Sequence, residues 1–119
     1  IESHVVLGGF VAEEDLLDLY ASATAVFHPA WIDFDLTVME GLSLSKKVIC
    51  STDYDLSGDL GELKDKLLFK ASPDPVSMAK VIETALDTKS ISANEAKQAL
   101  SKYTWENYSN NLLSHLIQF

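Results

Sequence analysis

The sequence predicts an α/β domain with a parallel sheet and flanking helices. Short runs rich in β-branched and other apolar residues alternate with stretches in which apolar residues recur every three or four positions. This alternation is typical of parallel strands joined by right-handed helical crossovers. The 119 residues fit one domain, and because 47% of them are apolar, the chain is expected to bury a core of its own.

Four apolar runs are predicted to be the strands of this sheet. They span residues 4–7, 24–28, 47–50 and 67–69. The first run stops at Gly8-Gly9 and the second at Pro29, two signals that end strands. Because the first run is short and β-branched, we expect it to be a buried parallel strand.

Five helices are expected between and after these strands. They cover 13–23, 36–44, the stretch after Asp74-Pro75, the stretch from Ser92 to about Lys102, and the stretch after Thr104. Asp35, Asp74, Ser92 and Thr104 are predicted N-caps, and Ser92 forms a capping box with Glu95. In the last helix, the residues expected to face the core are Trp105, Tyr108, Leu112, Leu113, Leu116 and Ile117.

Charge excludes several classes of partner. The chain has 9 basic and 18 acidic residues, a net charge of −9, and every basic residue is a lysine. Nucleic-acid binding is not expected, because it needs a basic face and arginine is its preferred donor. The longest uncharged stretch, residues 19–32, is too short to cross a bilayer. No secretory signal is visible and Cys50 is the only cysteine, so we expect a cytoplasmic location, with any membrane attachment provided by other parts of the polypeptide.

Parallel sheets bind ligands beyond the carboxyl ends of their strands. By that rule, the candidate ligand-binding segments are residues 8–12, 29–36 and 51–59. His28 lies at the carboxyl end of its predicted strand, the correct end for a ligand contact. The acidic loop from Asp53 matches part of an EF-hand, but Lys64 stands where a bidentate glutamate is needed, so no metal site is expected. Cys50 is interpreted as a packing residue rather than an activated thiol.

Several segments, in their order along the chain, resemble one known family. They are Val6-Leu7-Gly8-Gly9-Phe10-Val11, Phe27-His28-Pro29-Ala30, Leu36-Thr37-Val38-Met39-Glu40-Gly41, Lys47-Val48-Ile49-Cys50-Ser51 and Tyr103-Thr104-Trp105-Glu106. This order is similar to the C-terminal, Rossmann-like nucleotide-sugar-binding domain of retaining GT-B glycosyltransferases. The resemblance covers nearly all of residues 1–119 as a single domain, but only the later part of the family's domain. The family's first strands would precede Ile1, so we expect a piece of a longer protein.

The resemblance implies a donor site and its residues. In the family, two glutamates eight positions apart contact the nucleotide ribose and the transferred sugar, which makes Glu40 the expected ribose ligand. Counting back from Glu40 reaches Ile32, which cannot bind a hydroxyl, so a loop shorter by one residue would make Asp33 the sugar-binding and catalytic acid. Phe34 then takes the family's aromatic position, and Glu62 is a further candidate for a sugar or ribose contact.

The implied substrates are a nucleotide sugar and a glycan, lipid or protein acceptor, with an N-terminal GT-B domain as partner and no cofactor. Departures from the family favour a second interpretation. Asp35 replaces a glycine and would repel a donor phosphate, while Lys46 and Lys47 lie at the wrong end of their strand to bind it. The alternative is therefore a catalytically silent GT-B-like domain that serves as a structural or protein-interaction module.

Two structural expectations follow. The carboxylate of Glu40 should point to the crevice at the carboxyl ends of the strands. The strands at 24–28, 47–50 and 67–69 should pair side by side. Residues 4–7 should pair directly with 24–28 or with another chain, because an unpaired buried strand leaves costly backbone groups without partners.

Overall fold

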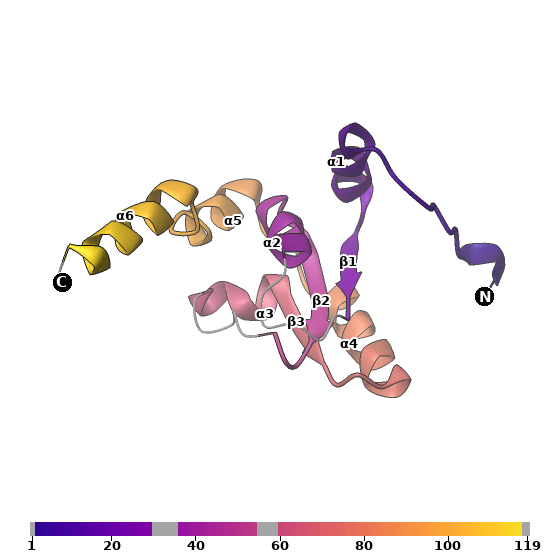
Figure 1. The fold of residues 1–119 in the computed structure, drawn as a ribbon. Helices are drawn as coiled ribbons and strands as arrows, with labels where there is room; N and C mark the ends of the chain where they lie inside the picture. The colour runs from indigo at the N-terminus through magenta and orange to yellow at the C-terminus, as the bar shows by residue number, and fades with distance from the viewer. Residues whose placement is uncertain (1, 30–35, 55–59, 118–119) are drawn as a thin grey trace.

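The computed structural model describes residues 2–29, 36–54 and 60–117, which form an α/β unit on a three-stranded parallel sheet (Figure 1). Its strands are β1 (Ala25–His28), β2 (Lys47–Ser51) and β3 (Leu68–Ala71), in the order β1-β2-β3. Both pairs are parallel, with Val26 opposite Val48 and Ile49 opposite Phe69. The predicted class and the side-by-side pairing of these strands are confirmed.

The central strand β2 separates two apolar clusters, because its successive side chains point to opposite faces of the sheet. Val48 and Cys50 belong to a cluster with residues of α2 (Leu36–Ser43) and α5 (Ala93–Ala99). Ile49 belongs to a second cluster with residues of α4 (Pro75–Asp87). All five residues of β2 are buried, so the core lies on both faces of this strand.

The predicted start signals of the helices after β3 are confirmed. The backbone N–H of Ser77 donates to Asp74 Oδ1 at 2.8 Å, and Pro75 occupies the first turn of α4. Ser92 and Glu95 form the reciprocal capping box of α5. In α6 (Trp105–Leu116), the backbone N–H of Asn107 donates to Thr104 Oγ1 at 3.1 Å. These bonds join residues three positions apart, which is why sequence predicts them well.

Two consecutive lysines attach helices to the amino end of β2. Lys46 Nζ donates to the carbonyl of Ala21, near the end of α1 (Glu13–Ser22), at 2.6 Å. Lys47 is buried, and its Nζ donates to the carbonyls of Leu86 and Thr88 at the end of α4. A cation near the last carbonyls of a helix is favourable. Both lysines therefore lie at the amino end of β2, as predicted, and away from its carboxyl end.

Some boundaries differ from the prediction. A 3-10 turn η2 (Gly61–Leu63) and a short helix α3 (Lys64–Leu67) precede β3, so Leu67 ends a helix rather than beginning a strand. The helix α5 ends at Ala99, before Lys102. An apolar residue at an element boundary is buried in either conformation, and hydrophobicity alone does not choose between them.

The strand expected at residues 4–7 is wrong. A short 3-10 helix η1 (Glu2–His4) is followed by residues 5–10 without regular structure, and Leu7 and Phe10 are each more than nine-tenths exposed. Figure 1 shows this segment leaving the body beyond α1. A strand needs a neighbour for its backbone groups, and none of the three strands in the described ranges pairs with it. Direct pairing with 24–28 is therefore not observed, while pairing with another chain stays a prediction.

The buried face expected for the last helix is also wrong. No described residue of α6 is buried; Trp105 is 80% exposed, and Tyr108, Leu113 and Ile117 are exposed as well. The helix extends away from the sheet (Figure 1). The amphipathic pattern predicted the helix correctly, but the sheet offers no face at this position for the helix to cover.

No helix among the described residues has both the length and the apolar character needed to cross a membrane.

Candidate functional site

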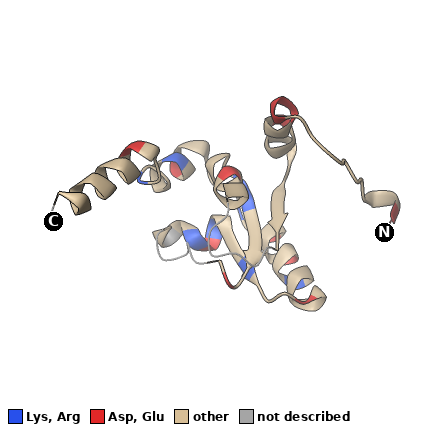
Figure 2. Cartoon of the chain, viewed as in Figure 1, with Lys and Arg blue, Asp and Glu red and all other residues tan. Residues whose placement is uncertain are grey.

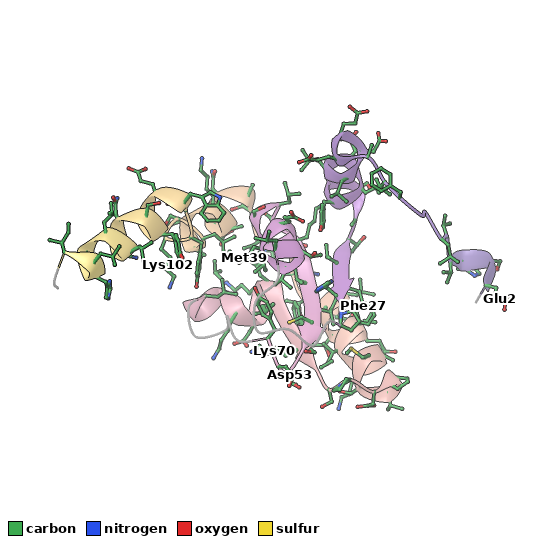
Figure 3. All side chains as sticks on the ribbon, in the orientation of Figure 1. Glu2, Phe27, Met39, Asp53, Lys70 and Lys102 are labelled. Carbon is green, nitrogen blue, oxygen red and sulfur yellow. The ribbon has the colours of Figure 1, made fainter. Side chains whose placement is uncertain are left out.

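The carboxyl ends of β1 and β2 place His28 and Ser51 at one edge of the sheet. His28 is the last residue of β1, half-buried, and opposite Cys50 in the strand register. Ser51 is fully buried and organises the turn after β2, because its Oγ accepts from the N–H of Asp53 and its carbonyl accepts from the N–H of Tyr54. Tyr54 thereby returns into the core, and Asp53 remains exposed at the turn (Figure 3).

Part of the predicted site lies outside the described residues. Asp33 and Phe34, with the flanking positions from Trp31 to Asp35, fall in the undescribed range 30–35. Glu62 is described only through its backbone, which is part of η2. The roles predicted for these side chains therefore stay predictions.

Glu40 lies on α2, and a tyrosine of another helix binds its carboxylate. The Tyr20 hydroxyl donates to Glu40 Oε2 at 3.0 Å. Tyr20 is in the last turns of α1, which lead into the amino end of β1. We expected the Glu40 carboxylate to point to the crevice at the carboxyl ends of the strands. The bond to Tyr20 instead directs this carboxylate toward α1. Sequence reasoning missed the pair, since 20 residues separate its members and neither has a local signal for the other.

α2 lies very close to the sheet. A Cβ atom on Gly41 would be 2.8 Å from Val48 Cγ2 and 3.3 Å from Val26 Cγ2. Glycine therefore allows α2 to pack over β1 and β2 at a distance that alanine would not tolerate without shifts. This packing sets how far α2 lies from the sheet. Because α2 follows β1 and leads to the amino end of the parallel strand β2, its first turn lies toward the carboxyl edge of the sheet.

Cys50 is unsuited to nucleophilic chemistry. Its side chain is 1% exposed, and burial raises the pKa of its thiol from 9.0 to about 11, although the nearby Lys70 ammonium acts in the opposite direction. A thiol with so high a pKa stays protonated at neutral pH and is a poor nucleophile. The interpretation of Cys50 as a packing residue agrees with this environment.

The described residues contain no group of three or more histidine, cysteine, aspartate or glutamate side chains arranged to hold a metal ion. Within the same residues, the carboxyl edge offers the imidazole of His28 and the first turn of α2, whereas the hydroxyl of Ser51 is fully buried and holds the turn after β2. An imidazole and a helix start can form hydrogen bonds to a polar ligand, and sheets of this kind bind ligands at this edge.

Neither a family model, nor a curated protein, nor a solved structure matches this chain. The resemblance to GT-B glycosyltransferases therefore rests on the motifs and on their order.

Proposed function

We propose that this chain is the donor-binding part of a glycosyltransferase, which transfers a sugar from a nucleotide sugar to a glycan, lipid or protein acceptor. The observation that carries the proposal is the close packing of α2 on β1 and β2 through Gly41. It holds α2 against the sheet, and because α2 follows the carboxyl end of β1 and leads to the amino end of the parallel strand β2, its first turn lies toward the edge where both strands end. A helix start at such an edge favours an anionic ligand. The order of the family-like motifs along the chain supports the same assignment.

The roles of the residues follow the resemblance. Glu40 would bind the nucleotide ribose, and Asp33 the transferred sugar, with Phe34, His28 and Glu62 around them. For Glu40 this role requires that its carboxylate release the Tyr20 hydroxyl and turn from α1 toward the carboxyl edge, where it would accept from a ribose hydroxyl. Catalysis would be completed by an N-terminal GT-B domain.

The hydrogen bond between Tyr20 and Glu40 also favours a second function, that of a protein-interaction module. If the Tyr20–Glu40 bond is permanent, the carboxylate joins α1 to α2 and serves the fold rather than a ligand. Asp35, in place of a glycine, also opposes a donor phosphate. The chain would then be a catalytically silent module that binds other proteins.

Titration with nucleotide sugars distinguishes the two functions. We expect UDP-, GDP- or ADP-glucose to bind the isotopically labelled chain with a Kd on the order of millimolar or weaker, without turnover. Amide shifts should centre on His28, Ser51 and the first turn of α2. Asp35→Gly should strengthen binding and Glu40→Gln should weaken it, whereas Glu106→Gln, on α6, should leave it unchanged. Shifts absent from this edge for all three nucleotides would favour the interaction module, and a micromolar Kd would contradict the expected weak binding.

A further inference from the structure

Polar contacts near its C-terminal end attach α1 to the body of the molecule. The Tyr20 hydroxyl donates to Glu40 Oε2 at 3.0 Å, and the carbonyl of Ala21 accepts from Lys46 Nζ at 2.6 Å. No described residue of α1 is buried. Because α1 buries no side chain, hydrogen bonds such as these contribute a large share of what holds it against α2 and β2.

The bond between Tyr20 and Glu40 is suited to exchange. Glu40 is exposed and Tyr20 is half-buried, so water reaches the bond and can replace either partner. α1 carries four acidic residues and no basic one, and Figure 2 shows the acidic start of this helix. Tyr20 therefore gives the Glu40 carboxylate a neutral donor on a helix whose own charges repel that carboxylate. A ligand that offers a hydroxyl can compete for such a contact.

The geometry of α2 provides a second position for the same carboxylate. Side chains of an α-helix lean toward its N-terminus. The first turn of α2 lies toward the carboxyl edge of the sheet, where β1 ends at His28. Rotation about the side-chain bonds of Glu40 would carry its carboxylate from α1 toward that edge, while Gly41 keeps α2 packed on the sheet. The two positions exclude each other, because one carboxylate cannot lie at α1 and at the edge together.

We propose that the bond between Tyr20 and Glu40 is an autoinhibitory contact, which holds the carboxylate away from the carboxyl edge until a ligand displaces the tyrosine. The inference rests on the proposed function, in which Glu40 binds the ribose of a nucleotide sugar. Ligand and Tyr20 then compete for one carboxylate, so each weakens the binding of the other by the same factor. A bound nucleotide sugar releases Tyr20, while Lys46 still holds the end of α1.

Titration of the whole 119-residue chain with UDP-, GDP- and ADP-glucose, followed by amide chemical shifts, tests the contact. Tyr20→Phe removes only the hydroxyl. We expect it to lower the Kd of the nucleotide sugar that binds by about three- to tenfold, the effect of losing one competing hydrogen bond. Tyr108→Phe is the matched control, because Tyr108 is exposed on α6, and it should leave the Kd unchanged. Thermal unfolding of both variants verifies that they fold.

The unsubstituted chain offers a second readout. In protein labelled with carbon-13 at tyrosine, Glu40→Ala should shift the Tyr20 Cζ resonance of the free chain, because the hydroxyl loses its acceptor. A saturating nucleotide sugar should shift the same resonance of the unsubstituted chain in the same direction. A resonance that the bound ligand leaves in place would show that Tyr20 keeps the carboxylate, and would overturn the proposal.

The affinities separate this proposal from the proposed function. Binding by Tyr20→Phe where the unsubstituted chain shows none would support the autoinhibitory contact. Equal Kd values for the two chains, or weaker binding by Tyr20→Phe, would overturn it and leave the proposed function in place. If neither chain binds any of the three nucleotide sugars, the proposed function is wrong and the autoinhibitory contact is wrong with it.

Discussion

The helices α4 and α6 begin with the same kind of signal and reach opposite outcomes. Each has a side-chain N-cap, Asp74 or Thr104, and each carries an apolar stripe. α4 buries Met78 and Ala85, and Ala85 packs with Ile49 and Phe69 of the sheet, whereas no described residue of α6 is buried. The difference teaches that capping and periodicity decide whether a helix forms, while burial depends on a neighbouring surface that local sequence does not encode.

The largest expected effect is a difference in stability between a leucine variant on α2, which packs on the sheet, and one on α6, which does not. Leu42 on α2 is 0% exposed, and Leu112 on α6 is 48% exposed. Leu42→Ala should lower the free energy of unfolding by about 2–5 kcal/mol, because it removes buried contacts and leaves a cavity. Leu112→Ala, the same substitution in the same kind of element, should cost less than about 1 kcal/mol.

Urea unfolding followed by circular dichroism measures both values on the same scale. Equal losses for the two variants would mean that α6 is part of the cooperative core after all, and the contrast between the two regions would then be wrong.

The same contrast explains what sequence can predict. The caps at Asp74, Ser92 and Thr104 bind backbone groups three residues away, so their signal is contained in a short window. The three apolar runs that form strands each pair with a neighbouring strand of the same sheet. Residues 4–7 have the same composition but no neighbour, and they are not a strand. Composition therefore predicts a candidate strand, and pairing decides whether it forms.

The candidate site was less predictable than the fold. The position of His28 and Ser51 at one edge follows from topology alone, because the carboxyl ends of parallel strands share an edge. The contact between Tyr20 and Glu40 depends on how α1 and α2 sit in space, and no pattern along the chain reports that arrangement. The sequence thus predicted which residues share an edge of the sheet better than which contacts their side chains make.

The buried thiol of Cys50 on β2 predicts that the free energy of unfolding depends on pH. Burial raises the pKa of the Cys50 thiol to about 11 in the folded chain, against 9.0 for an unperturbed thiol. The folded state therefore holds this proton more tightly than the unfolded state. The resulting stability is fully present below about pH 9 and is lost as the pH rises toward 11, by up to roughly 2–3 kcal/mol.

Urea unfolding at several values between pH 7.5 and 10.5 measures this slope. Cys50→Ala is the control: it should lower stability by a constant amount and remove the part of the pH dependence that belongs to the thiol. A slope that is identical in the two proteins would show that the thiol titrates at its ordinary pKa in the folded chain.

The smallest expected effect compares the two caps directly. Asp74→Ala removes the acceptor for the N–H of Ser77, and because α4 packs on the sheet, the loss of about 1 kcal/mol should appear in the global free energy of unfolding. Thr104→Ala removes an equivalent bond to Asn107, but α6 has no buried residue to couple it to the core. Its loss should instead appear locally, as faster hydrogen exchange at the amides of α6, with an unchanged urea midpoint for the sheet. If Thr104→Ala lowered the global stability as much as Asp74→Ala does, α6 would have to unfold together with the sheet, and the separation of the molecule into a cooperative core and an independent terminal helix would fail.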